Sequence, residues 1–254
     1  MPNAVTACKT PFRSWVIDDV SALVPASLCR DAYAAVPPCD WPGWCRYDNA
    51  LENRKRTARD RDELPAPCGA LLSYLSDNRQ PDSFLYRLAA AIDFGELLTI
   101  DPYLHGAGIH VTDPGGWLQV HGDYELHPLL PWAERRLSLV LYLNPSWESH
   151  WGGETLLCDG MGAAVEAVMP APGRALVFEG GNAAFHGCRP TSPDAPPRVT
   201  AAVYYLGAAR PSAHRRRAMF LPNRDAADAP PRELAPPAIA GPGTRPSLIA
   251  RSRP

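Results

Sequence analysis

Residues 118–128 read LQVHGDYELHP, and this stretch decides the fold that the sequence predicts. An alternating run at 118–120 ends in His121, one glycine and Asp123. In a β-strand, residues two apart point to the same face, so the imidazole and the carboxylate would converge on one spot. A nitrogen ligand and an oxygen ligand placed together in this way indicate a metal site, which needs at least one further ligand.

Short β-rich runs lie on both sides of this stretch, from about residue 98 to residue 206. They are LLTIDPYL, GIHVTD, WLQVHGD, RLSLVLYLN, GETLLCD, AAVEAVM, RALVFEG, AAFHGC and RVTAAVYYL. Turn signals such as PGG, WGG, APG and EGG separate them. Closely spaced strands without helices between them predict an all-β sandwich or barrel. We therefore expect a mainly β fold with flanking helices.

The 254 residues suit one globular domain with three regions. Residues 1–97 look mixed and would buttress the core, with helices expected in VPASLCRDAYAAV, ELPAPCGALLSYLSD and DSFLYRLAAAIDF. Pro25 would begin the first of these helices, and Asp82 would cap the third. Residues 98–206 form the β core. Residues 207–254, rich in Pro, Ala and Arg, are expected to be a flexible tail.

Composition and charge exclude several classes of function. The net charge is −2, and the basic cluster HRRR at 214–217 is too short to indicate a nucleic-acid partner. No apolar run approaches the length of a membrane span, and the first residues lack the pattern of a secretory signal. Seven cysteines without a CxxC pair are typical of reduced thiols. We expect a cytoplasmic protein that binds neither nucleic acid nor membrane.

His186, in EGGNAAFHGCRP, is the candidate for the third metal ligand. It lies in a strand-like run that follows another strand and a turn, and in a closed double sheet this return strand could bring it beside the first pair. Two histidines and one carboxylate make the facial triad of non-haem iron(II) enzymes, which leaves positions open for other ligands. On these residues alone His186 could also be a core histidine, because an HxD pair is common by chance.

The order of the neighbouring motifs resembles the prolyl 4-hydroxylase-like branch of the iron(II)/2-oxoglutarate dioxygenases. After HxD comes RRLSLVLYLNPSWESHWGGETLL, similar to that branch's strand ending in Tyr-Leu-Asn, then a tryptophan and a glycine pair. APGRALVFEGGNAAFHGCRP resembles the segment whose histidine completes the metal site, and PPRVTAAVYYL resembles the strand that opens with an arginine. The resemblance covers roughly residues 98–206. It departs from the family pattern in the insert TSPDAPP, which lengthens the interval after the second histidine.

This resemblance implies a double-stranded β-helix core of the jelly-roll or cupin type, and an enzyme that uses Fe(II), 2-oxoglutarate and O2. His121, Asp123 and His186 would hold the iron. Arg198 and Tyr142 would bind the far carboxylate of 2-oxoglutarate, Arg198 with two parallel hydrogen bonds. The implied reaction oxidises an unactivated C–H bond, by default to an alcohol, and releases succinate and CO2. Outside the resemblance, Arg198 would be taken for a surface arginine and Tyr142 for a core aromatic.

The sequence leaves the primary substrate open, together with the position and stereochemistry of oxidation and the choice between hydroxylation, desaturation, epimerisation and cyclisation. Tyr124, Glu125, His127 and Trp151 are weaker candidates for contact with the substrate. No peptide-binding module stands outside the core, which favours a small molecule such as an amino acid or a biosynthetic intermediate over a peptidyl-proline substrate. A cupin-like metal- or sugar-binding barrel without oxygenase activity would explain the strands and the metal, but not the carboxylate-binding pair.

Residues 51–64, LENRKRTARDRDEL, form the most highly charged segment before the core. A solvated loop or helix face is the first interpretation of such a run. The alternative is a lid whose cations hold an anionic substrate, because mobile loops close many active sites. The oligomeric state is also open, although exposed strand edges could pair two copies into a homodimer.

Overall fold

The structure is a computed structural model that describes residues 5–213 and 218–221, and its strands form one curled antiparallel sheet. Its strands are β1 (Val5–Cys8), β2 (Ser14–Ile17), β3 (Cys45–Tyr47), β4 (Glu52–Ala58), β5 (Thr99–Ile100), β6 (Gly108–Gly122), β7 (Ala133–Tyr142), β8 (Thr155–Cys158), β9 (Ala164–Val168), β10 (Ala175–Glu179), β11 (Phe185–Cys188), β12 (Arg198–Ala208) and β13 (Met219–Phe220). The order is β1-β2-β10-β7-β12-β6-β11-β8-β9. In addition β4 and β13 pair with β6, β3 pairs with β4, and β5 pairs with β12. The expected mainly β fold is confirmed.

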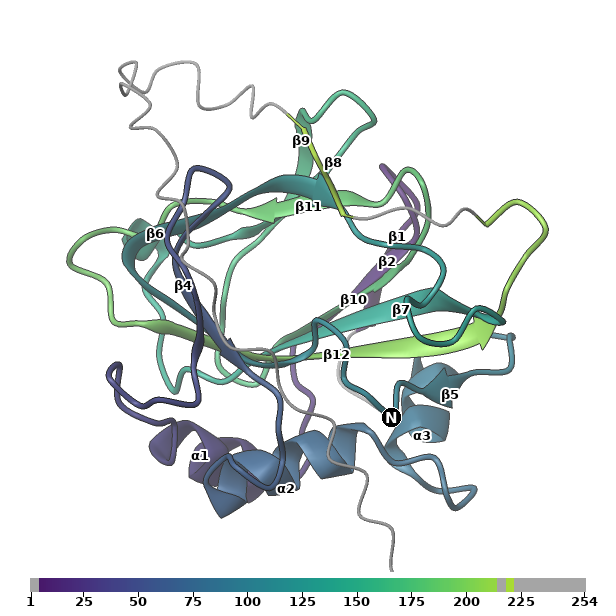
Figure 1. The fold of residues 1–254 in the computed structure, drawn as a ribbon, viewed down its shortest axis with the longest axis horizontal. Helices are drawn as coiled ribbons and strands as arrows, with labels where there is room; N and C mark the ends of the chain where they lie inside the picture. Colours follow the sequence, from purple (N-terminus) through teal and green to yellow (C-terminus); the bar gives the residue numbers. More distant parts are fainter. Residues whose placement is uncertain (1–4, 214–217, 222–254) are drawn as a thin grey trace, which may run out of the picture.

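Strand β6 joins the two layers of the curled sheet (Figure 1). Its first half, Gly108–Thr112, pairs with β12, whereas its second half pairs with β11. The sequence predicted two strands here, separated by a turn at the PGG segment 114–116. The segment instead loops out within one long strand: β4 pairs with β6 on both sides of it, and the Arg54 guanidinium donates to the Pro114 carbonyl (2.7 Å).

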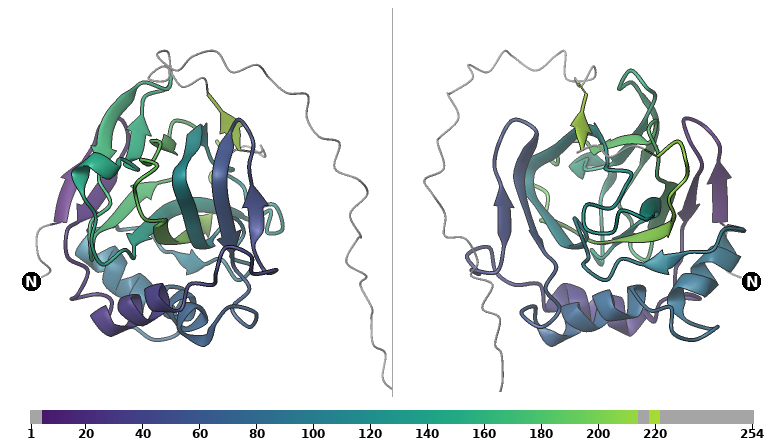
Figure 2. Two further views of the ribbon diagram at one scale, coloured as in Figure 1. Left: turned by 90° about the vertical axis from the view of Figure 1, so that its left-hand side faces the viewer. Right: turned by 45° about the vertical axis from the view of Figure 1, so that its right-hand side comes forward.

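Three helices cover the outer face of the β7–β12 layer (Figures 1 and 2). They are α1 (Ala26–Ala34), α2 (Ala66–Leu75) and α3 (Phe84–Ala91), within the three segments where helices were predicted. The core alternates as a sheet requires: in the layer that the helices cover, alternate strand residues belong to one hydrophobic cluster with the helices. On β12 these residues are Val199, Ala201, Val203 and Tyr205, and on β7 they are Leu137, Leu139 and Leu141. The residues between them are thus left facing the interior of the curled sheet.

Two of the predicted helix starts need correction. Asp82 does not cap the third helix: the N-cap residue is Ser83, whose hydroxyl accepts from the Gln80 amide (2.9 Å). Pro25 is itself the N-cap residue of α1, one position before the first helical residue. Among the described residues no helix combines the length and the apolarity that a membrane crossing requires.

The N-terminal third contributes strands to the sheet as well as helices. Strands β1 and β2 extend the edge next to β10, and β3 and β4 extend the edge next to β6. The interpretation of residues 51–64 as a solvated loop or helix face is wrong for residues 52–58, which form β4. Hydrogen-bonded pairing with β3 on one side and β6 on the other stabilises the strand despite the many charges of this segment. One of these charged residues, Arg56, is buried.

The C-terminal region is described only in part. Strand β12 continues to Ala208, and β13 pairs with the end of β6. Residues 218–221 therefore lie on the core rather than in a detached tail. The basic cluster 214–217 and residues 222–254 lie outside the described residues, so the flexible tail stays a prediction there.

Candidate metal centre

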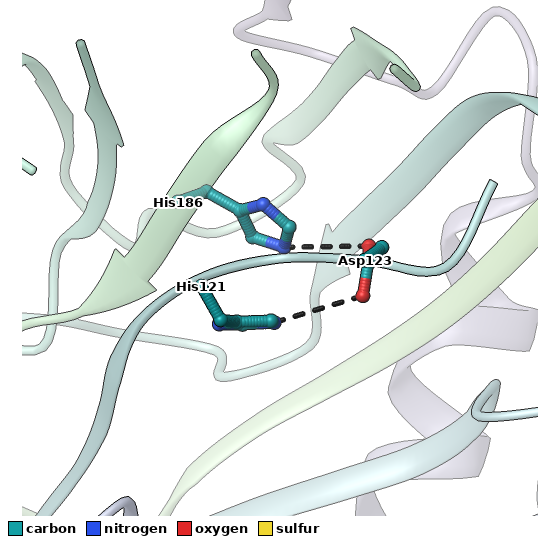
Figure 3. A group of neighbouring side chains, drawn as sticks. All are labelled: His121, Asp123 and His186. Carbon is teal, nitrogen blue, oxygen red and sulfur yellow. Dashed lines mark ion pairs between the residues drawn. The ribbon is translucent and has the colours of Figure 1, made fainter. Parts of the chain in front are cut away.

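The end of β6 and strand β11 bring three potential metal ligands together. His121 lies directly opposite His186 in the antiparallel register, and Asp123 follows one residue after the end of β6. Nε2 of His121 lies 3.6 Å from Oδ1 of Asp123, and Nε2 of His186 lies 3.6 Å from Oδ2 of the same carboxylate (Figure 3). One ligand atom from each residue can be chosen so that all three lie within 4.8 Å of one another. The sequence-predicted triad is thus assembled.

The hydrogen bonds of the two imidazoles involve Nδ1 and leave Nε2 of each ring available to bind a metal. Nδ1 of His121 pairs with the Gln119 carbonyl (2.9 Å), and Nδ1 of His186 pairs with the Ala184 carbonyl (3.0 Å). A carbonyl accepts only, so each Nδ1 carries the proton and each Nε2 offers a lone pair. The 3.6 Å separations are too long for hydrogen bonds. They suit an ion bonded at roughly 2.0–2.2 Å to each ligand atom, and a divalent metal fits this donor set.

Burial and the surrounding charges keep His186 and Asp123 in their metal-binding protonation states. Burial and the nearby His121 lower the pKa of His186 to about 4, so that its imidazole is neutral. Burial alone would raise the pKa of Asp123, but the positive charge of Arg135 holds it well below the usual range. The carboxylate is therefore ionised.

Arg135 is a neighbour of the triad that the sequence did not reveal. Its guanidinium forms an ion pair with Asp123 and is 2% exposed. It is held between two aromatic rings, with its Cζ 4.0 Å from the centroid of Tyr124 and 3.5 Å from that of Tyr204. Stacking on both faces fixes the plane of a guanidinium, and so fixes the carboxylate it grips.

The two residues predicted to bind 2-oxoglutarate lie in a second polar cluster. Arg198 is 6% exposed and donates to the Gly153 carbonyl (2.8 Å) and to Oγ1 of Thr155 (2.9 Å). The Tyr142 hydroxyl is 2.8 Å from the same Oγ1. Arg198 and Thr155 line the cavity that also contains the triad, whereas Tyr142 is fully buried behind Thr155. Thr155 was not among the sequence-predicted residues, because a threonine in a β-run is ordinary.

The triad and this cluster share one cavity of about 240 Å³. Its remaining wall comes mainly from β3, β4 and the inward-facing residues of β6 and β12, which are polar for the most part. Among the weaker substrate candidates, Tyr124 lines the cavity and its hydroxyl donates to the His105 carbonyl (3.2 Å). A cavity that joins a metal triad to a buried cation can hold an anionic ligand between the two.

The other three weak candidates lie elsewhere. His127 is fully buried, 3.3 Å from Asp101, and its Nδ1 accepts from two backbone amides, which gives it a structural role in the loop before β7. Trp151 packs against Trp147, with ring centroids 5.4 Å apart, and does not line the cavity. Glu125 is buried and lines a separate depression. These three residues do not line the cavity that contains the triad, so they are not placed to contact a substrate there.

Comparison with known proteins gives a family match and similar solved structures. Residues 107–206 match the family model described as the 2OG-Fe(II) oxygenase superfamily. A search of curated protein sequences finds no match.

Among solved structures, a prolyl-4-hydroxylase of Pseudomonas putida is 18% identical with a TM-score of 0.50, over 74% of this chain and 89% of that one. A viral collagen prolyl hydroxylase of Paramecium Bursaria Chlorella virus-1 is 12% identical (TM-score 0.48; 77% and 96% covered). A prolyl hydroxylase of Trichoplax adhaerens, solved with a hypoxia inducible factor peptide fragment, is 16% identical (TM-score 0.46; 76% and 83% covered). The first likeness shows a shared fold, and the expected double-stranded β-helix is confirmed.

Proposed function

Because residues 107–206 match the model of the 2OG-Fe(II) oxygenase superfamily, we propose that this protein oxidises an unactivated C–H bond of a small molecule, most simply by hydroxylation. Fe(II), 2-oxoglutarate and O2 are the metal and co-substrates of that superfamily. In this proposal His121, Asp123 and His186 hold the iron. The observation that carries it is that the assembled triad and a buried arginine line the same cavity.

The triad residues bind and orient the metal. The two Nδ1–H groups are tied to backbone carbonyls, so both rings are held with Nε2 toward Asp123. Arg135 positions the carboxylate, and its charge opposes protonation of Asp123. When bound, iron(II) together with 2-oxoglutarate supplies the oxidising power for C–H cleavage, and the protein supplies the geometry and the exclusion of water.

Arg198, Thr155 and Tyr142 would receive the far carboxylate of 2-oxoglutarate. A guanidinium stays charged even when buried, and its planar fork suits a carboxylate. Gly153 and Thr155 hold Arg198 in place from one side. The Tyr142 hydroxyl supports Thr155 from behind, so it would act on the co-substrate through Thr155.

The size of the cavity favours a small substrate. Pockets for small ligands usually measure about 300–1,000 Å³. The volume here, about 240 Å³, must accept the co-substrate and the reacting part of the substrate together. A compact molecule that the protein can surround suits this space better than an extended chain.

Anaerobic spectroscopy tests the proposal. Addition of Fe(II) and 2-oxoglutarate should give a visible charge-transfer band, and His121→Ala or His186→Ala should abolish it. His150→Ala is the matched control, because His150 is exposed and lies outside the cavity. Absence of the band from the wild-type protein, or its survival in both triad variants, would contradict the proposal.

A further inference from the structure

Strand β4 presents a charged pair to the same cavity. Lys55 Nζ lies 3.1 Å from Glu52 Oε2, and the side chains are only 13% and 17% exposed. Both residues line the cavity with the metal triad. Residues three apart in a regular strand point to opposite faces, so their shared direction needs an explanation.

The explanation is an interruption of the strand at Arg54. Its φ is +49°, a left-handed conformation that residues with a Cβ rarely adopt, and the ladder between β4 and β6 shifts register there. Irregularities of this kind re-aim side chains and occur next to functional sites. The hydrogen bond from Arg54 to the Pro114 carbonyl fixes the interruption (2.7 Å). The distortion at Arg54 thus directs the side chains of both Glu52 and Lys55 into the cavity.

A second, independent observation marks the same wall as a ligand site. His110 also lines the cavity, and its Nε2 is buried without a hydrogen-bond partner. Burial and the charge of Lys55 lower the pKa of His110 to about 3, so its imidazole is neutral. A buried polar atom without a partner is unfavourable unless a ligand completes its hydrogen bonding.

The chemistry of the pair selects among ligands. A ligand with a single charge would pair with Lys55 or with Glu52 and leave the other ion without its partner in a largely buried place, which is costly. An uncharged ligand can hydrogen-bond to the two ions, but it brings no charge to replace the one that each ion loses when the pair opens. A zwitterion with an ammonium and a carboxylate close together can insert between the two side chains and give each a new partner.

We propose that the substrate is a zwitterion of the α-amino acid type, with its carboxylate bound by Lys55 and its ammonium bound by Glu52. This inference rests on the proposed function and adds the substrate class. The interior of a peptide carries neither charge, so the pair selects against a peptide segment and for a free amino acid.

A turnover assay tests the charge pattern. Succinate release is measured with the common free α-amino acids, their C-terminal amides and their N-acetyl derivatives. We expect a free amino acid to stimulate release, and both derivatives of that amino acid to show kcat/KM at least tenfold lower. Lys55→Met should remove the discrimination against the amide, and Glu52→Gln should remove the discrimination against the N-acetyl form. Lys9→Met is the matched control, because Lys9 is exposed.

A labelling experiment gives a readout that does not depend on turnover. Lys9 and Lys55 are the two lysines of the chain. In the protein loaded with Fe(II) and 2-oxoglutarate without oxygen, the stimulating amino acid should slow acetylation of Lys55 severalfold and leave Lys9 unchanged, as read by mass spectrometry.

The outcomes separate the two proposals. If the charge-transfer band forms but no amino acid stimulates turnover or protects Lys55, the zwitterion inference is wrong while the oxygenase proposal stands. The inference is also wrong if Lys55→Met raises the KM for 2-oxoglutarate instead of that for the amino acid, because Lys55 would then belong to the co-substrate site. If the band does not form, the oxygenase proposal itself fails.

Discussion

Replacement of Arg198 by methionine should weaken the binding of 2-oxoglutarate by about 30-fold to about 4,000-fold. Methionine keeps an apolar stem of similar length but removes the charge. Because Arg198 is 6% exposed, the carboxylate it would bind loses a buried cationic partner. Truncation of one member of a buried, hydrogen-bonded charge pair costs about 2–5 kcal/mol, and about 1.4 kcal/mol is tenfold in Kd.

The measurement is an anaerobic titration of the Fe(II) protein with 2-oxoglutarate, followed by the charge-transfer band. Arg198→Lys should fall between wild type and Arg198→Met, because it keeps the charge and loses the fork. Arg189→Met is the control: this arginine is 45% exposed, and its pair with Glu154 is at the surface (3.5 Å). Thermal unfolding without ligands establishes that each variant is folded. A folded Arg198→Met protein with wild-type Kd would refute the assignment of Arg198 to the co-substrate.

Three further predictions concern the supporting structure. The buried carboxylate of Glu134 would have a raised pKa from burial alone, but its hydrogen bonds from Arg210 lower it. A lowered folded-state pKa stabilises the fold fully above the unfolded value of about 4.3, and this stabilisation is lost as the pH falls through the folded value. Glu134→Gln should therefore lower the free energy of unfolding by about 2 kcal/mol at pH 7 and by less below pH 4, as followed by chemical denaturation; an equal loss at both pH values would contradict this. Phe220→Ala removes the ring stacked 5.3 Å from His121 and should raise the metal Kd roughly 2- to 12-fold in a competition assay, an effect that excess metal overcomes. Tyr205→Phe removes the hydroxyl that donates to α2 (2.9 Å) and should cost about 1 kcal/mol of unfolding free energy without a change in Kd for metal.

The sequence predicted those features of the fold and the site that follow from regular alternation of side chains and from the order of motifs. His121 and Asp123 were identified because an HxD at the end of a strand places two ligands together. His186 was a candidate because it lies in a return strand, and the resemblance supported it, but the register that sets it opposite His121 could only come from the structure. The helices were predicted because their apolar residues recur at clear helical spacing. Strand β4 was missed because its sequence is highly charged and its pairing depends on strands β3 and β6.

The sequence could not predict the residues that irregular strands turn inward. Leu137 and Arg135 are two apart on β7, so alternation places both on the helix side. Only Leu137 is there: the register with β12 shifts by one residue at Arg136, and Arg135 faces the cavity. Nothing in the sequence ERRLSLVLY indicates that β7 contains an extra residue at Arg136.

Three irregularities of this sheet share one physical cause. Each strand beside the cavity must give apolar side chains to the helices or to a neighbouring layer, which fixes every second position. A charged residue at a position that alternation would place on the apolar side can then reach the cavity only where the strand gains a residue or reverses its alternation. Register shifts at Arg54 on β4, at Arg136 on β7 and between Leu118 and His121 on β6 occur where the cavity receives a charge or a ligand. The regular parts of the sheet therefore provide the fold, and its interruptions direct charged groups and a metal ligand into the cavity.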